Sequence, residues 1–133
     1  MERSYQFITF LILLFLSFSN GILAQVRTEE NITIGFVSDG NWPLFPLYQS
    51  AIKSEVEKLT RNDFTVVFPF DKSLKGDWTS EGIERKLHTL MNDPEVDLVV
   101  TIGAISSHLS GRLTTYEKPL IATIVLDPKL QNL

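Results

Sequence analysis

The chain has 133 residues, with 12 Lys and Arg against 16 Asp and Glu, and its net charge is −4. This acidic balance argues against nucleic acid as a partner, because proteins that bind phosphate backbones carry an excess of basic side chains. The absence of Cys excludes disulfides, thiolate metal sites, a cysteine nucleophile and attachment of a lipid to a cysteine. A chain of this length forms about one domain.

The amino terminus has the pattern of an export signal. Arg3 precedes an almost wholly apolar stretch at residues 7–16, and a polar break then leads to Ala24. This arrangement is typical of a signal peptide and predicts cleavage after Ala24. The alternative is an uncleaved membrane anchor at residues 7–24, although its apolar core is about half of the roughly 20 residues that span a bilayer. Both interpretations predict a periplasmic or other extracytoplasmic location for the rest.

The remainder, residues 25–133, is predicted to be one compact unit. It alternates short apolar runs with amphipathic segments, and it contains no repeat, low-complexity tract or Gly/Ser linker. Apolar side chains alternate with polar or small ones from Ile32 to Phe36, which predicts a first strand. A loop rich in turn-forming residues follows at residues 38–43.

A helix and a second strand come next. Pro46 suits the first turn of a helix, and apolar residues then recur at helical spacing as far as Leu59. The β-rich run at residues 64–68 predicts the second strand, which a proline ends. The polar segment at residues 71–77, which Trp78 follows, is either a flap over a cleft or a solvated connection. Its polar composition favours the solvated connection.

The second helix and the third strand have clear boundaries. The helix is predicted from Thr79 or Ser80, with acidic residues in its first turn, and an Asn-Asp-Pro sequence at residues 92–94 ends it. The apolar run at residues 96–102 is nearly continuous. Such a run predicts a strand covered by helices on both faces, and therefore the centre of the sheet.

A third helix and a fourth strand complete the pattern. After Gly103 an apolar stripe at helical spacing predicts a helix as far as Tyr116, although Gly111 lowers its helical propensity. A continuous apolar run at residues 120–126 predicts the fourth strand, and an Asp-Pro pair ends it.

The order βαβαβαβ predicts an α/β fold with a doubly wound parallel sheet. Strands joined by crossover helices lie parallel, and right-handed crossovers put helices on both faces. The expected spatial order of the strands is 2-1-3-4. Ligands of such sheets bind outside the carboxyl ends of the strands, near the point where the strand order reverses. Here that point lies between the first and third strands.

Two segments flank this reversal point. The loop after the first strand offers a hydroxyl, a carboxylate, an amide and an aromatic face, and Gly40 permits close approach of the backbone. The start of the third helix offers backbone N–H groups and two hydroxyls that suit a ligand carboxylate. A small polar or zwitterionic ligand is therefore predicted. The candidate ligand-binding residues are Ser38, Asp39, Asn41, Trp42, Gly103, Ala104, Ser106 and Ser107.

These residues also have purely structural interpretations. Ser106 would cap the third helix, Asp39 would cap the turn, and Trp42 would pack beneath the loop. For each residue taken alone the structural interpretation is favoured, because caps and packed aromatics are common.

The sequence predicts no catalytic residue, metal or cofactor. His88 and His108 have no partner at a spacing that sequence can identify, and both suit exposed helical positions. The chain contains no metal-ligand cluster, no nucleophile elbow and no nucleotide-binding glycine motif. An enzyme of flavodoxin-like form therefore has no supporting set of residues.

Residues 96–128 show a recognisable pattern: Val-Asp-Leu-Val-Val-Thr-Ile-Gly-Ala, a helix, Lys-Pro-Leu-Ile, and finally Asp127-Pro128. This pattern resembles the substrate-binding proteins of ABC transporters with the type I periplasmic-binding fold. The resemblance extends over residues 31–133 in the order of elements. It implies that residues 25–133 form the amino-terminal lobe of a non-catalytic receptor.

Such a receptor closes two lobes on a small organic ligand, such as an amino acid, and delivers it to a membrane permease. The resemblance places the ligand contacts on the loop after Val37 and on residues 103–107. Ala104 stands where family members often have a hydroxyl residue, so the identity of the ligand does not transfer. A second lobe is expected as a partner of this one. The alternative function is an extracytoplasmic ligand-sensing domain of a signalling protein, which a retained anchor would favour.

Overall fold

The computed structural model describes residues 31–127 and 129. The elements in chain order are β1 (Asn31–Ser38), α2 (Phe45–Thr60), β2 (Thr65–Val67), the 3₁₀ turn η2 (Phe70–Lys72), β3 (Ser73–Lys75), α3 (Ser80–Met91), β4 (Leu98–Ile102), α4 (Ala104–Gly111) and β5 (Leu120–Ala122). The predicted signal peptide or anchor at residues 1–24 lies outside the described residues. No helix within the described part of the chain is long and apolar enough to cross a membrane.

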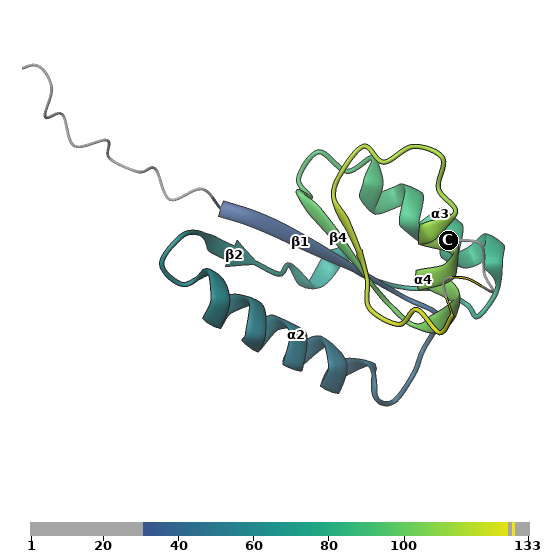
Figure 1. Ribbon diagram of the computed structural model, residues 1–133, viewed down its shortest axis with the longest axis horizontal. Coiled ribbons are helices and arrows are strands. Elements are labelled where there is room, and N and C mark those ends of the chain that lie inside the picture. Colours follow the sequence, from purple (N-terminus) through teal and green to yellow (C-terminus); the bar gives the residue numbers. More distant parts are fainter. Residues whose placement is uncertain (1–30, 128, 130–133) are drawn as a thin grey trace, which may run out of the picture.

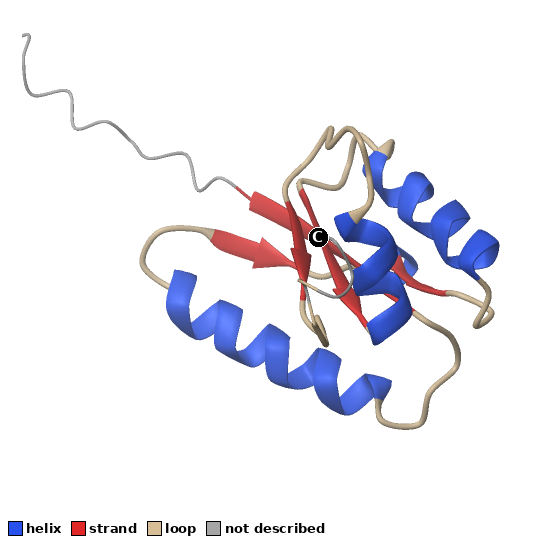
Figure 2. Cartoon of the chain, turned by 45° about the vertical axis from the view of Figure 1, so that its right-hand side comes forward, coloured by secondary structure: helices blue, strands red, loops and turns tan. Residues whose placement is uncertain are grey.

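The strands form one parallel sheet in the order β2-β1-β4-β5, and β3 also pairs with β1. Since β4 and β5 are the third and fourth predicted strands, the α/β class and the order 2-1-3-4 are confirmed. In Figures 1 and 2, α2 runs along one face of the sheet, while α3 and α4 lie on the other. The sheet is therefore covered by helices on both faces.

The core consists of two clusters, one on each face of the sheet. Along β1, successive side chains point to opposite faces, so that Phe36 packs on the α2 side and Val37 on the α3 side. In β4, Val99 and Val100 divide in the same way. Burial on both faces explains why the sequence of β4 is continuously apolar.

The edge strand beside β1 is divided into two parts, which corrects the prediction of a solvated connection at residues 71–77. β2 pairs with residues 31–33 of β1, and β3 pairs with residues 36–38. Between them, Pro69 has no N–H to donate to a ladder, and the chain turns through η2. Leu74 of β3 packs against the core on the α3 side. The segment therefore contributes a strand and a core contact.

The third predicted helix and the fourth predicted strand are both longer than the observed α4 and β5. α4 ends at Gly111, where the N–H of Leu113 donates to the carbonyl of Ser110 at 3.2 Å and tightens the last turn. Tyr116 lies beyond the helix, and its hydroxyl donates to the same carbonyl at 2.9 Å. β5 pairs with β4 only over residues 120–122.

The face of the sheet beside α2 is incompletely covered. An apolar groove of about 560 Å³ runs between α2 and the sheet, and both Ile52 of α2 and Ile121 of β5 line it. Ile121 is 49% exposed. Within residues 31–127 no second helix lies over this face, so the apolar run of the fourth predicted strand remains partly open to solvent.

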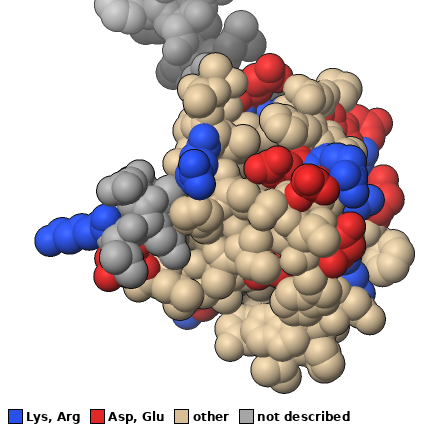
Figure 3. Space-filling model, turned by 90° about the vertical axis from the view of Figure 1, so that its right-hand side faces the viewer, with Lys and Arg blue, Asp and Glu red and all other residues tan. Residues whose placement is uncertain are grey.

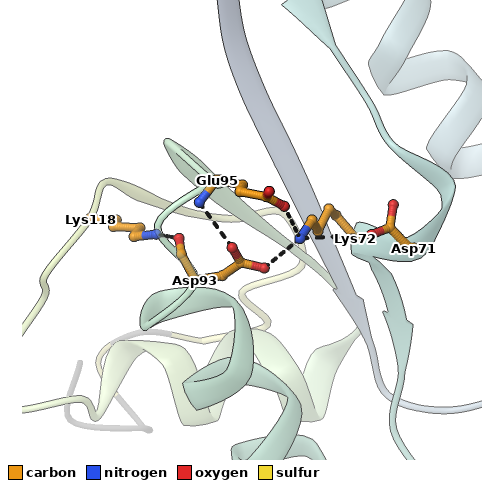
Figure 4. Close-up of polar contacts among 5 residues, drawn as sticks. All are labelled: Asp71, Lys72, Asp93, Glu95 and Lys118. Carbon is orange, nitrogen blue, oxygen red and sulfur yellow. Dashed lines mark hydrogen bonds and ion pairs between the residues drawn. The ribbon is translucent and has the colours of Figure 1, made fainter.

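An ion cluster connects Lys72, the last residue of η2, to the loop between α3 and β4 (Figure 4). The Nζ of Lys72 lies 2.7 Å from an oxygen of Asp93 and 2.8 Å from one of Glu95, and Lys118 donates to the backbone carbonyl of Asp93. Hydrogen bonds from the side chain of Lys72 and from the N–H of Glu95 lower the pKa of Asp93. The bonds to Asp93 and Glu95 raise the pKa of Lys72.

Replacing Lys72 by Met is expected to lower the midpoint of thermal unfolding near neutral pH, because Asp93 loses its principal hydrogen-bond donor. The folded pKa of Asp93 lies below its ordinary value of 3.8, so this contribution is complete above about pH 4 and is lost as the pH falls through the lowered pKa. The raised pKa of Lys72 keeps its charge at neutral pH. Circular dichroism melts from about pH 2 to about pH 8 should therefore show a difference that shrinks in acid.

Lys58→Met is the matched control. The Nζ of Lys58 lies 3.5 Å from the Oε1 of Glu55 on the exposed surface of α2. Exposed ion pairs of this kind contribute little to stability. A Lys72→Met variant that melts no lower than Lys58→Met, or whose deficit does not depend on pH, would contradict a structural role of the cluster.

Candidate ligand-binding site

A pocket of about 310 Å³ lies at the carboxyl edge of the sheet, where the strand order reverses between β1 and β4. It is lined by Ser38, Asp39, Gly40, Trp42, Trp78, Ile102, Gly103, Ala104 and Ile124. Five of the predicted contact residues therefore surround one pocket, namely Ser38, Asp39, Trp42, Gly103 and Ala104. Asn41, Ser106 and Ser107 do not line it.

Asp39 joins the two walls of the pocket. One carboxylate oxygen accepts a hydrogen bond from the N–H of Ile105 at 3.0 Å, and the other accepts one from the N–H of Ser106 at 2.7 Å. Amides in the first turn of a helix have no partner within the helix, and a negative charge there is favoured by the helix dipole. The position predicted for a ligand carboxylate is thus filled by the chain itself, so the expectation of free N–H groups is wrong.

The hydroxyls of Ser106 and Ser107 serve the fold. Both residues are fully buried. The Oγ of Ser106 lies 3.4 Å from the carbonyl oxygen of Gly103, to which it donates. The Oγ of Ser107 lies 3.2 Å from the hydroxyl of Thr101 and accepts the N–H of Ile124 at 3.2 Å. Ser107 therefore positions Ile124 in the pocket wall and does not face a ligand.

Ser38 and Asn41 also have partners within the chain. Ser38 is buried, and its hydroxyl donates to the carbonyl of Gly40 at 3.1 Å. This bond stabilises the turn after β1. Asn41 is exposed, and its side-chain oxygen accepts from the Nζ of Lys75 at 3.3 Å. That contact links the loop to β3 outside the pocket wall.

Two tryptophans supply the aromatic surface of the pocket. Trp42 stacks on Tyr48, with ring centroids 5.1 Å apart, and packs against the core on the α2 side. Trp78 is 53% exposed, and its backbone N–H donates to the backbone carbonyl of Asp39, with 2.8 Å between nitrogen and oxygen. The sequence does not single out Trp78, because it follows a segment that reads as a solvated connection. Recognising β3 would have placed this side chain at the carboxyl edge of the sheet.

Two glycines allow the walls to approach closely. A Cβ at Gly40 would overlap the ring of Trp78, and a Cβ at Gly103 would overlap the carboxylate of Asp39. Gly103 also has a φ of 146°, which side chains of L-residues disfavour. The close approach predicted at Gly40 is therefore present, and its partner is an aromatic ring of the chain itself.

Other reactive side chains lie away from the pocket. His88 is exposed on α3, whereas His108 is partly buried on α4 and its Nδ1 has no hydrogen-bond partner among the described residues; the expectation of an exposed His108 is thus wrong. No group of three or more His, Asp or Glu side chains within the described ranges is placed to hold a metal ion. On the face drawn in Figure 3, acidic and basic side chains are intermixed.

Comparisons with known proteins supply no assignment. The sequence matches no family model, and neither a search of curated proteins nor a search of solved structures finds a match. The functional interpretation rests on the pocket and on the sequence pattern.

Replacing Asp39 by Ala is expected to destabilise the fold by about 0.5–2 kcal/mol, as the loss of a helix cap does. Asp39→Asn should cost less, because the amide retains one acceptor oxygen. Urea unfolding measures the difference, and the amide resonances of Ile105 and Ser106 should move most. The control is Glu57→Ala, since Glu57 is exposed on α2 and lies outside the pocket. Equal stability of the two alanine variants would show that the Asp39 bonds contribute nothing.

Proposed function

We propose that this chain is an exported, non-catalytic module that binds a small organic ligand, similar in plan to the first lobe of an ABC transporter substrate-binding protein. The observation that carries this proposal is the pocket between the loop after β1 and the start of α4. Parallel α/β sheets bind their ligands at this position. The pattern at residues 96–128 supports the same family.

The geometry of the pocket is compatible with a small ligand. Its volume of about 310 Å³ is at the lower end of the range of about 300–1,000 Å³ for such sites. The two bonds of Asp39 hold the loop after β1 against the start of α4, across separations of 66 and 67 residues. The pocket is therefore formed before a ligand arrives. One wall, Trp78, remains half exposed, as expected where a second lobe would close.

Export is the part of the proposal that concerns residues 1–24. The expected mature protein begins at Gln25, and mass spectrometry of protein recovered outside the cytoplasm tests this prediction. A membrane-bound species that still begins at Met1 would contradict cleavage. It would favour the alternative function, a ligand-sensing domain held at the membrane.

Ligand binding by this lobe alone is expected to be millimolar or weaker. A single lobe encloses only part of a ligand, and each loss of about 1.4 kcal/mol in contacts weakens affinity tenfold. The test is a nuclear magnetic resonance titration of the ¹⁵N-labelled chain with a panel of amino acids, aromatic amines and carboxylates. Shifts should be confined to residues around the pocket.

The control variant is Ala104→Trp, which fills the pocket from the partly exposed start of α4. It should abolish the shifts while α3 and the core keep their spectra. The proposed function is wrong if no compound in the panel moves the pocket resonances. It is also wrong if the ligand-induced shifts persist in Ala104→Trp. A submicromolar complex with the monomer would show that one lobe is a complete binder.

A further inference from the structure

The polar side chains of Ser38 and Asp39 in the pocket lining are already bonded within the fold. Both carboxylate oxygens of Asp39 accept N–H groups of α4, and the hydroxyl of Ser38 donates to Gly40. Asp39 is one of the residues that line the pocket, although only 7% of it is exposed. An anionic ligand therefore cannot use the N–H groups of Ile105 and Ser106, because the Asp39 carboxylate already occupies them. The pocket disfavours anions.

The remaining wall is aromatic and aliphatic, formed by Trp42, Trp78, Ile102, Ala104 and Ile124. The indole of Trp78 lies directly against the backbone of Gly40, and the residue is 53% exposed. Planar rings stack on such a surface, and a cation is attracted to the face of an indole. The wall therefore favours a planar ring that is neutral or positively charged.

The backbone of Trp78 supports the same role. Its φ is 68°, a left-handed conformation that is unfavourable for a bulky residue and natural for glycine. The hydrogen bond from its backbone N–H to the carbonyl of Asp39 fixes this conformation at the pocket. A half-exposed side chain contributes little to the core, so packing does not explain why the strain is retained. Strain of this kind is concentrated at ligand sites.

We infer that the pocket takes a planar aromatic compound without negative charge, and that it favours one that carries an amine. The ring stacks on Trp78, and the positive charge of the amine is attracted to the indole. This inference rests on the proposed function of the pocket and names the ligand class. It departs from the amino-acid expectation, because the helix amides that would bind a ligand carboxylate are occupied by Asp39.

Three probes separate charge from aromaticity: benzylamine, benzoate and cyclohexylmethylamine. Each is titrated into the ¹⁵N-labelled chain, and the indole N–H resonance of Trp78 reports binding. Benzylamine is expected to bind about tenfold more tightly than either of the others, since only it combines a stacking ring with a positive charge.

Two variants test the role of Trp78. Trp78→Gly should fold at least as stably as the wild type, because glycine suits the φ of 68°, yet it should bind benzylamine roughly tenfold more weakly, as read from backbone amides of the pocket. Phe70→Ala removes an aromatic residue that is 94% exposed and does not line the pocket. It should change neither property.

The outcomes distinguish this inference from the proposed function. If benzoate binds as tightly as benzylamine, or if Trp78→Gly keeps its affinity, the ligand class is wrong while the pocket remains a ligand site. If no probe binds but other small compounds move the pocket resonances, the ligand class is again wrong. If no compound of any class moves them, both the ligand class and the proposed function are wrong.

Discussion

The two hydrogen bonds that Asp39 accepts from the start of α4 connect parts of the chain that are 66 and 67 residues apart. They join the carboxyl end of β1 to the carboxyl end of β4, and so determine the distance between the pocket walls. The carboxylate satisfies amides that the helix leaves unpaired and places a negative charge at the positive end of its dipole. Gly103 is required beside it, since a side chain there would overlap the carboxylate.

The wall formed by Trp78 also depends on Asp39, because the backbone N–H of Trp78 donates to the backbone carbonyl of Asp39. β3 pairs with β1 up to the partners Ser38 and Lys75, and the pairing continues as the N–H groups of Gly76 and Trp78 donate to Ser38 and Asp39 at 2.8 Å. Immediately before β3, Lys72 at the end of η2 pairs with Asp93 and Glu95. Trp78 and the ion cluster of Lys72 therefore lie beyond the two ends of the three-residue strand β3.

Hydrophobic periodicity predicted most of the fold and the place of the pocket. The predicted start of the second helix is observed, with Thr79 as the cap that accepts the N–H of Gly82 at 3.0 Å. The reversal of strand order located the site without knowledge of any side-chain contact. β3 was not predicted, because three residues with one apolar side chain show no periodicity. The partners of Asp39 were not predicted either, since a carboxylate in a loop has the same residue type whether it binds a ligand or a distant helix.

Whether Asp39 binds α4 or is free for a ligand determines the charge at this edge of the sheet. With free amides, the start of α4 would present a positive end to the pocket and attract a carboxylate. With Asp39 bound to those amides, the positive end is neutralised within the protein, and these amides are no longer free to bind a carboxylate. The fold and the strand order are the same in both cases. The charge presented at this sheet edge therefore depends on the side chain one residue beyond β1 and on whether it reaches α4.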